Sequence, residues 1–130
     1  MPARFDLIGL VVSDLDRSLA FYRELGVPVP EREPDQVHVE VALEGGLRLA
    51  WDTVETVRSF DPSWVAPSGG HGVSLAFECE SAAGVDETYE AMVAAGATGH
   101  LAPWDAVWGQ RYATIHDPDG HSIDLFAALD

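Results

Sequence analysis

The sequence repeats one order of structural signals twice, at an offset of about sixty to seventy residues. In each half, an apolar strand pattern precedes an amphipathic helix and three further strands. The halves cover about residues 4–60 and 71–130. Neither half can close a barrel alone, so we expect an α+β fold of paired βαβββ modules, whose curved mixed sheets enclose a cleft. At 130 residues, the chain is expected to form a single domain, residues 1–130.

The periodicity of the apolar residues predicts the individual elements. A helix is expected over 15–25, with Ser13 and Asp14 as candidates for its N-cap and Gly26 as its C-cap. The segment 53–70 carries several Pro and Gly residues and is predicted to be a long connecting loop, and 117–120 a type I turn. The other predicted elements are a helix that stops at Gly96 and strands at 7–12, 27–30 (irregular or at an edge), 36–43, 47–52, 73–78, 111–116 and 122–127.

Charge and cysteine content exclude several classes of partner. The chain has 22 acidic residues against 7 basic ones, all Arg, for a formal charge of −15. Such a chain repels phosphate backbones and anionic lipid surfaces, so neither nucleic acid nor a membrane is expected as a partner. The single Cys79 cannot form an internal disulfide, and no signal peptide pattern opens the sequence, so a cytoplasmic location is expected.

Two motifs resemble the vicinal oxygen chelate superfamily, which holds glyoxalase I, extradiol dioxygenases and the bleomycin-resistance proteins. The first is Val-Ser-Asp-Leu-Asp-Arg-Ser-Leu-Ala-Phe-Tyr at 12–22. The second is Asp-Pro-Asp-Gly at 117–120, followed by Ile-Asp-Leu at 123–125. The resemblance covers essentially the whole chain and implies the paired βαβββ fold. Function is left open, because metal enzymes and metal-free binders share this scaffold.

The resemblance also implies where a metal would bind. In the metal enzymes, the first and last strands of each module supply the ligands, usually His, Glu or Gln. The resemblance assigns these positions to Leu7, the vicinity of Ala50, Gly72 and Asp124. Only Asp124 could bind a metal, so no metal and no cofactor are expected. A shift of one residue would bring His71 inward, and Glu40 or His116 could then assist. The structural alternative for the Asp124 carboxylate is a hydrogen bond from Ser122, Thr114 or a backbone amide.

A closer resemblance is to the mitomycin-binding resistance proteins of antibiotic producers. Its carriers are the segments 48–62 and 103–112, together with His38 and Glu40. In that subgroup, a tryptophan before the seventh strand and an aromatic or imidazole ring of the partner subunit clasp a flat ring system. By position these groups are Trp108 and His38. The resemblance therefore implies a homodimer with a small planar ligand as its partner.

The tryptophan content agrees with a planar ligand, because the sequence has four tryptophans and three of them lie in loop-like segments. Indole faces stack on flat rings, and nearby carboxylates would accept from amino groups and favour a cationic guest. The predicted ligand-binding residues are His38, Glu40, Trp51, Asp52, Trp64, Trp104, Trp108, Arg111, Tyr112 and Asp124.

Several of these residues have structural alternatives. Trp51 and Trp104 could lie at a rim or a subunit interface, and His38 could be an ordinary exposed histidine. Tyr112 could pack at the floor of the cleft. Arg111 could pair with an acidic residue instead of a ligand carbonyl, namely Asp105 or Glu55.

Three functions are compatible with these observations. The first is a metal-independent protein that sequesters a planar antibiotic or natural product, which can be cationic, and has no catalytic residues. The alternative is a metal-dependent glyoxalase- or dioxygenase-type enzyme that uses a divalent metal near Asp124. The third is a metal-free catalyst with Asp124 or Glu40 as its base.

Overall fold

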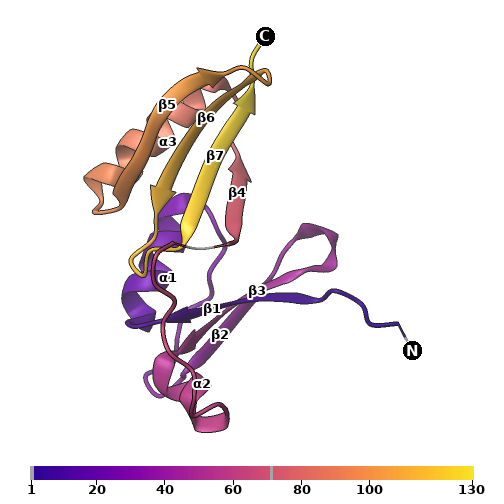
Figure 1. Cartoon of the computed structure of the whole chain (residues 1–130), viewed down its shortest axis with the longest axis vertical. Coiled ribbons are helices and arrows are strands. Elements are labelled where there is room, and N and C mark those ends of the chain that lie inside the picture. Colours follow the sequence, from indigo (N-terminus) through magenta and orange to yellow (C-terminus); the bar gives the residue numbers. More distant parts are fainter. Residues whose placement is uncertain (1, 71) are drawn as a thin grey trace. The chain divides into compact units, whose positions relative to one another are not determined.

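The computed structural model describes residues 2–70 and 72–130 (Figure 1). The chain divides into two compact units, Met1–Ala66 and Pro67–Asp130, which are described separately. This boundary falls between the two predicted modules. Each unit combines a mixed sheet with helices, which confirms the α+β class. The cleft between the modules stays a prediction.

The first unit is built on a three-stranded sheet in the order β1-β3-β2. β1 (Leu7–Val12) runs parallel to β3 (Arg48–Thr53), and β2 (His38–Ala42) runs antiparallel to β3. The helices are α1 (Leu15–Leu25), α2 (Val54–Phe60) and the short 3-10 helix η1 (Glu44–Gly46).

The core of this unit forms where α1 covers one face of the sheet. β3 places Leu49 and Trp51 on this face, where both are buried together with Val39 of β2. Trp51 is 0% exposed, and its ring centroid lies 5.5 Å from that of Tyr22 on α1. The sheet's other face therefore carries the alternate, more polar side chains.

The second unit is a four-stranded sheet in the order β4-β7-β6-β5. β4 (Ser74–Glu78) and β7 (Ser122–Ala128) are parallel, whereas β6 (Gln110–His116) is antiparallel to both β7 and β5 (Thr98–Ala106). The helix α3 (Ala82–Ala94) packs on β5, β6 and β7.

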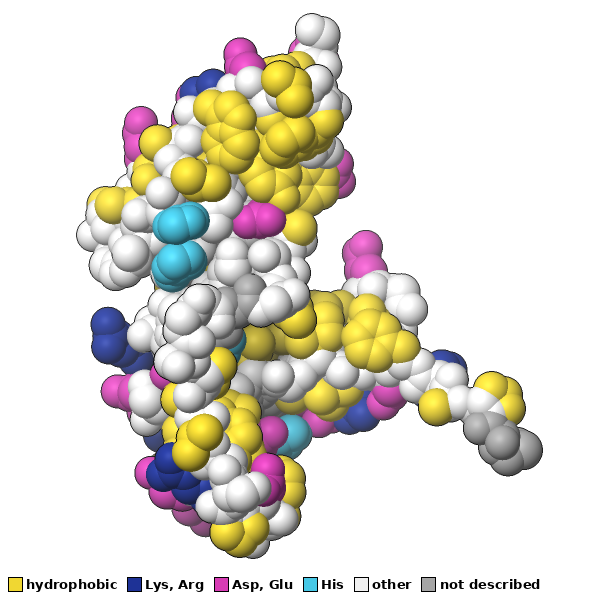
Figure 2. Space-filling view, in the orientation of Figure 1, with side chains coloured by type: hydrophobic (Ala, Val, Ile, Leu, Met, Phe, Trp, Pro, Cys, Tyr) yellow, Lys and Arg dark blue, Asp and Glu magenta, His cyan; other side chains and the backbone are white. Residues whose placement is uncertain are grey.

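Strand alternation gives this second sheet two unlike faces. The buried positions of β6 and β7, which pack toward α3, are Ala113, Ile115, Ile123, Leu125 and Ala127. The alternate positions on the opposite face are Tyr112, Thr114, Asp124 and Phe126. We call this opposite face the open face. Figure 2 shows hydrophobic side chains gathered over β5, β6 and β7.

Most predicted elements are confirmed to within one or two residues, including the helix 15–25 with its Asp14 N-cap and its left-handed Gly26 C-cap. In the turn at 117–120, the Gly120 N–H donates to the Asp117 carbonyl at 2.9 Å. Three expectations are wrong. The segment 27–30 forms no strand, and the predicted loop 53–70 contains α2, which is capped by its preceding Thr53. Trp104, expected in a loop-like segment, lies on the strand β5.

Within the part of the chain that the structure describes, no helix has both the length and the apolar character needed to cross a bilayer.

We predict that Trp51→Ala lowers the free energy of unfolding by about 3–5 kcal/mol, because it leaves a large cavity in a packed core. Trp108→Ala is the matched control. Its indole is 58% exposed, so the loss should be about 1 kcal/mol or less. Urea unfolding of both variants measures the difference. Equal losses would contradict the assignment of Trp51 to the core.

Candidate binding site on the open face

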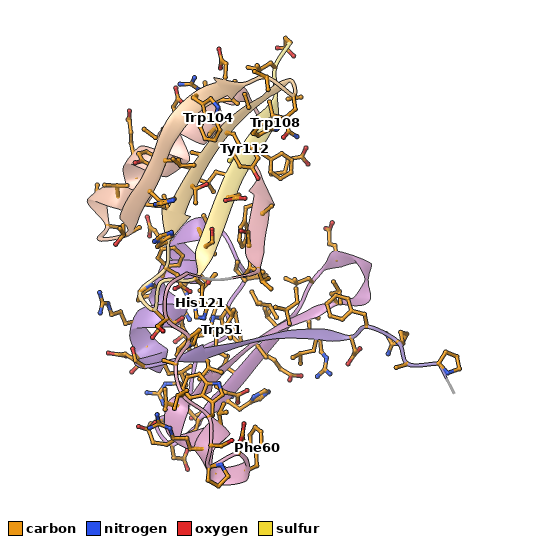
Figure 3. The ribbon with its side chains drawn as sticks, viewed as in Figure 1. Trp51, Phe60, Trp104, Trp108, Tyr112 and His121 are labelled. Carbon is orange, nitrogen blue, oxygen red and sulfur yellow. The ribbon has the colours of Figure 1, made fainter. Side chains whose placement is uncertain are left out.

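Four aromatic side chains meet on the open face of the second unit. Trp104 of β5 and Tyr112 of β6 are register partners, with ring centroids 5.6 Å apart. The Trp108 centroid lies 6.1 Å from that of Trp104 and 5.4 Å from that of Tyr112, and both contacts are edge-to-face. Phe126 of β7 extends the group, with its centroid 6.5 Å from that of Tyr112. We call these four residues the aromatic cluster, and Figure 3 labels three of them.

Trp108 is both exposed and fixed in place. It lies in the turn between β5 and β6, where Gly109 adopts a φ of 92° that a residue with a side chain would adopt only with strain. Its indole Nε1–H donates to Gln110 Oε1 at 2.8 Å. The ring is 58% exposed despite these contacts. A large aromatic face is therefore held in one orientation and remains open to a ligand.

Asp124 lies next to the aromatic cluster and is held by two hydroxyl groups. Its Oδ2 accepts from the Tyr112 hydroxyl at 2.7 Å, and its Oδ1 accepts from Thr114 Oγ1 at 2.9 Å. Partial burial, together with the bond to this carboxylate and its charge, raises the pKa of Tyr112 to about 12. The Tyr112 phenol therefore stays protonated and keeps its role as donor.

Two histidines stack on the same sheet. The rings of His100 on β5 and His116 on β6 have centroids 4.7 Å apart and are inclined by 22°. His100 is exposed and His116 is half-buried.

Arg111 does not join the aromatic cluster. It follows Gln110 on β6 and points to the α3 side, where its guanidinium donates to both carboxylate oxygens of Asp86 at 2.9 and 3.1 Å. A further bond of 3.1 Å reaches Asp105. The predicted pairing with Asp105 is present, and Asp86 was missed. Because both ends of the guanidinium are occupied on the other face of the sheet, we leave Arg111 out of the site.

Three predicted site residues form an ionic group in the first unit. His38 Nδ1 lies 2.6 Å from Asp52 Oδ1, and His38 Nε2 lies 2.9 Å from Glu40 Oε2. Arg48 extends the group by donating to Glu40 and to Asp6. These residues line the face of β2 and β3 opposite to Trp51. The structure therefore brings these three predicted residues together, along with Arg48 and Asp6, which were missed, and their role in ligand binding stays a prediction.

The carboxylates on both sides favour the protonated form of His38. Hydrogen bonds to Glu40 and then Asp52, with their negative charges, raise the pKa of His38 above its ordinary value of 6.5, although partial burial opposes this. An imidazolium has two N–H donors and satisfies both carboxylates at once. In turn, the hydrogen bonds from His38 and Arg48 lower the pKa of Glu40. Glu40 is consequently a weak base.

The remaining two tryptophans, Trp51 and Trp64, do not belong to the aromatic cluster. Trp51 is fully buried in the core of the first unit, so the prediction that it contacts ligand is corrected. Trp64 follows α2, and its carbonyl accepts from Arg58 Nε at 3.1 Å. The Arg58 guanidinium also lies over its ring, 5.8 Å from the centroid. Trp64 belongs to the first unit, whereas the aromatic cluster belongs to the second.

Phe126 is the one member of the aromatic cluster that we missed. The available signal was its spacing of two residues from Asp124 within a predicted strand, which places both on one face.

The model of the Glyoxalase/Bleomycin resistance protein/Dioxygenase superfamily matches residues 4–125. The chain belongs to this superfamily. No curated protein is significantly similar to this sequence.

Solved structures of the superfamily are similar over nearly the whole chain. A glyoxalase/bleomycin resistance protein/dioxygenase from Nocardioides is 26% identical, with a TM-score of 0.75, over 100% of this chain and 86% of that one. A family enzyme from Burkholderia phytofirmans is 20% identical, with a TM-score of 0.81, over 98% of this chain and 100% of that one. The fosfomycin resistance protein FosX of Listeria monocytogenes, solved with Mn(II), is 18% identical, with a TM-score of 0.69, over 99% of this chain and 92% of that one. The latter two show the fold alone.

The described residues do not fit the metal site found in other members of the superfamily. Leu7 and Ala50 have hydrocarbon side chains, and Gly72 has none. Asp124 already accepts two hydroxyl hydrogen bonds. Among residues 2–70 and 72–130, no three His, Cys, Asp or Glu side chains are grouped to hold an ion. His71, the other residue considered, lies outside the described residues.

We predict that His38→Gln removes a pH-dependent share of stability. Since the pKa of His38 is raised in the folded chain, its stabilising effect is fully present below about pH 6.5 and is lost as the pH rises through the native pKa. The free energy of unfolding of the wild type relative to the variant should therefore fall as the pH rises above about 6.5, by less than about 1 kcal/mol, because the group is partly exposed. Urea unfolding across this range tests the sign. A difference that grows with pH would contradict it.

Proposed function

We propose that this protein sequesters a planar aromatic natural product on the open face of its second sheet, without a metal and without turnover. The observation that carries the proposal is the aromatic cluster, in which Trp108 is 58% exposed yet fixed by Gln110. Exposed aromatic groups that are held by neighbours lose little entropy when a ligand stacks on them. Each well-formed ring pair contributes about 1 kcal/mol beyond the area it buries.

Protection by such a protein would follow from mass action. A ligand held on the aromatic cluster is withdrawn from its target in proportion to the concentration of binding sites and their affinity. The superfamily's name spans resistance proteins as well as enzymes, so membership is compatible with sequestration. The resemblance of segments 48–62 and 103–112 to mitomycin-binding resistance proteins supports a flat ring system as ligand.

The enzyme alternatives receive less support from the described residues. The metal-dependent alternative lacks a suitable donor set around Asp124. The metal-free alternative needs a base, either Glu40 or Asp124. The bonds from His38 and Arg48 make Glu40 a weak base, and the Asp124 carboxylate already accepts hydrogen bonds from Tyr112 and Thr114.

We also propose that the protein acts as a homodimer, in which the partner's imidazolium at position 38 covers the bound ring. A cation over an aromatic face is attracted by the ring quadrupole, and the two carboxylates beside His38 favour its charged form. Light scattering should give twice the 14.0 kDa of one chain. If the protein is a monomer and still binds ligand, the proposal that a second copy's imidazole covers the ring is contradicted.

We predict that Trp108→Ala weakens binding of a neutral anthraquinone, such as 1-[(2-hydroxyethyl)amino]anthraquinone, by about tenfold, since the ligand loses one stacking face. Quenching of tryptophan fluorescence and calorimetry measure the affinity. The matched control is Phe60→Ala, which removes an aromatic ring that is 74% exposed on α2 of the first unit (Figure 3).

Equal affinities of the wild type and Trp108→Ala would contradict binding at the aromatic cluster. Stoichiometric divalent metal in protein purified without chelator, measured by elemental analysis, would favour the enzyme alternative instead.

A further inference from the structure

The geometry of the open face points to a specificity-determining residue. We propose that Asp124 selects planar ligands that carry a protonated amine about 7 Å from the ring centre. This inference rests on the proposed function and deepens it by naming the chemical class of ligand. Asp124 contacts the ligand's ammonium group, and the aromatic cluster contacts its rings.

Asp124 differs from the paired carboxylates of the second unit in having no cationic partner. Asp86 and Asp105 pair with Arg111, and Asp117 pairs with His121. Arg111 is the only basic residue in 67–130 other than histidine, and it lies on the α3 side of the sheet. Among the described residues, no Arg or His forms an ion pair with Asp124. Its negative charge on the open face is therefore left for a ligand to neutralise.

The two hydroxyl contacts orient this carboxylate without neutralising it. Tyr112 and Thr114 each donate one hydrogen bond to it, at 2.7 and 2.9 Å. A carboxylate has about four lone-pair sites, so each oxygen of Asp124 keeps acceptor capacity. On β4, its register partner is Ala76, whose methyl group is exposed and small enough to leave the carboxylate accessible from that side. An ammonium group can therefore approach a fixed acceptor.

Strand geometry sets the distance between the two contacts. Tyr112 pairs with Phe126, and Thr114 pairs with Asp124, so the aromatic pair and the carboxylate pair are successive rows on one face. Two residues along a strand span about 7 Å. When a ligand's ring stacks on the aromatic row, a short aminoalkyl arm on that ring can therefore reach the Asp124 carboxylate. An anionic arm would be repelled by Asp124, in a chain whose formal charge is already −15.

The test uses two anthraquinones that share one ring system. The cationic probe is 1-[(2-aminoethyl)amino]anthraquinone, and the neutral probe carries a hydroxyl group in place of the terminal amine. We expect the wild type to bind the cation about tenfold more tightly, because a charge-assisted hydrogen bond is added. This preference should fall as salt is raised, since ions screen the pair. Asp124→Asn should abolish the preference, so that the ratio of the two affinities falls from about ten to about one.

The control variant is Glu90→Gln, which removes one exposed negative charge from α3 on the other side of the sheet. It should keep the preference for the cation, and thermal unfolding of each variant reports whether its fold is intact. If both probes bind the wild type equally at low and high salt, the selection by Asp124 is overturned while the proposed function stands. If neither probe binds, the proposed function fails and the selection with it. If Glu90→Gln loses the preference for the cation as fully as Asp124→Asn does, the preference arises from the overall charge of the chain. That result would also overturn the role of Asp124.

Discussion

The site depends on one constraint, the alternation of side chains along β6 and β7. Ile115 and Leu125 must be buried against α3 for the second unit to have a core, and both are 0% exposed. The pleat then turns the alternate residues of these strands to the opposite face, among them Tyr112, Thr114 and Asp124. A shift of one residue in register would bury Asp124 and expose the core, so packing energy holds the binding groups in place.

Much of the fold could be predicted from sequence because it depends on short-range chemistry. The spacing of apolar residues and the Asp14 and Gly26 caps define α1. The Asp-Pro-Asp-Gly turn links β6 to β7 and sets their pairing. The same reasoning placed Trp104, Trp108, Tyr112 and Asp124 in two segments that the structure brings together, and it named Thr114 as a donor to Asp124.

The errors arise where tertiary contacts decide. Trp51 looks like a ligand-binding indole in the sequence, but its partner Tyr22 on α1 places it in the core. Arg111 lies between Trp108 and Tyr112 in the sequence, yet its bidentate bond to Asp86 needs α3, which no local pattern predicts. The helix α2 has only Val57 buried, so its apolar periodicity is too weak to distinguish it from a loop. The misses at Trp51 and Arg111 reflect contacts between elements that are distant in the chain.

The central claim is that the ligand meets the indoles of the open face and not the indole of the core. Nitrogen-15 NMR resolves the indole N–H signal of each of the four tryptophans and follows them during titration with a planar quinone. We expect the Trp104 and Trp108 signals to shift with ligand, while the Trp51 signal stays in place. Shifts at Trp51 with unmoved signals from Trp104 and Trp108 would contradict the account.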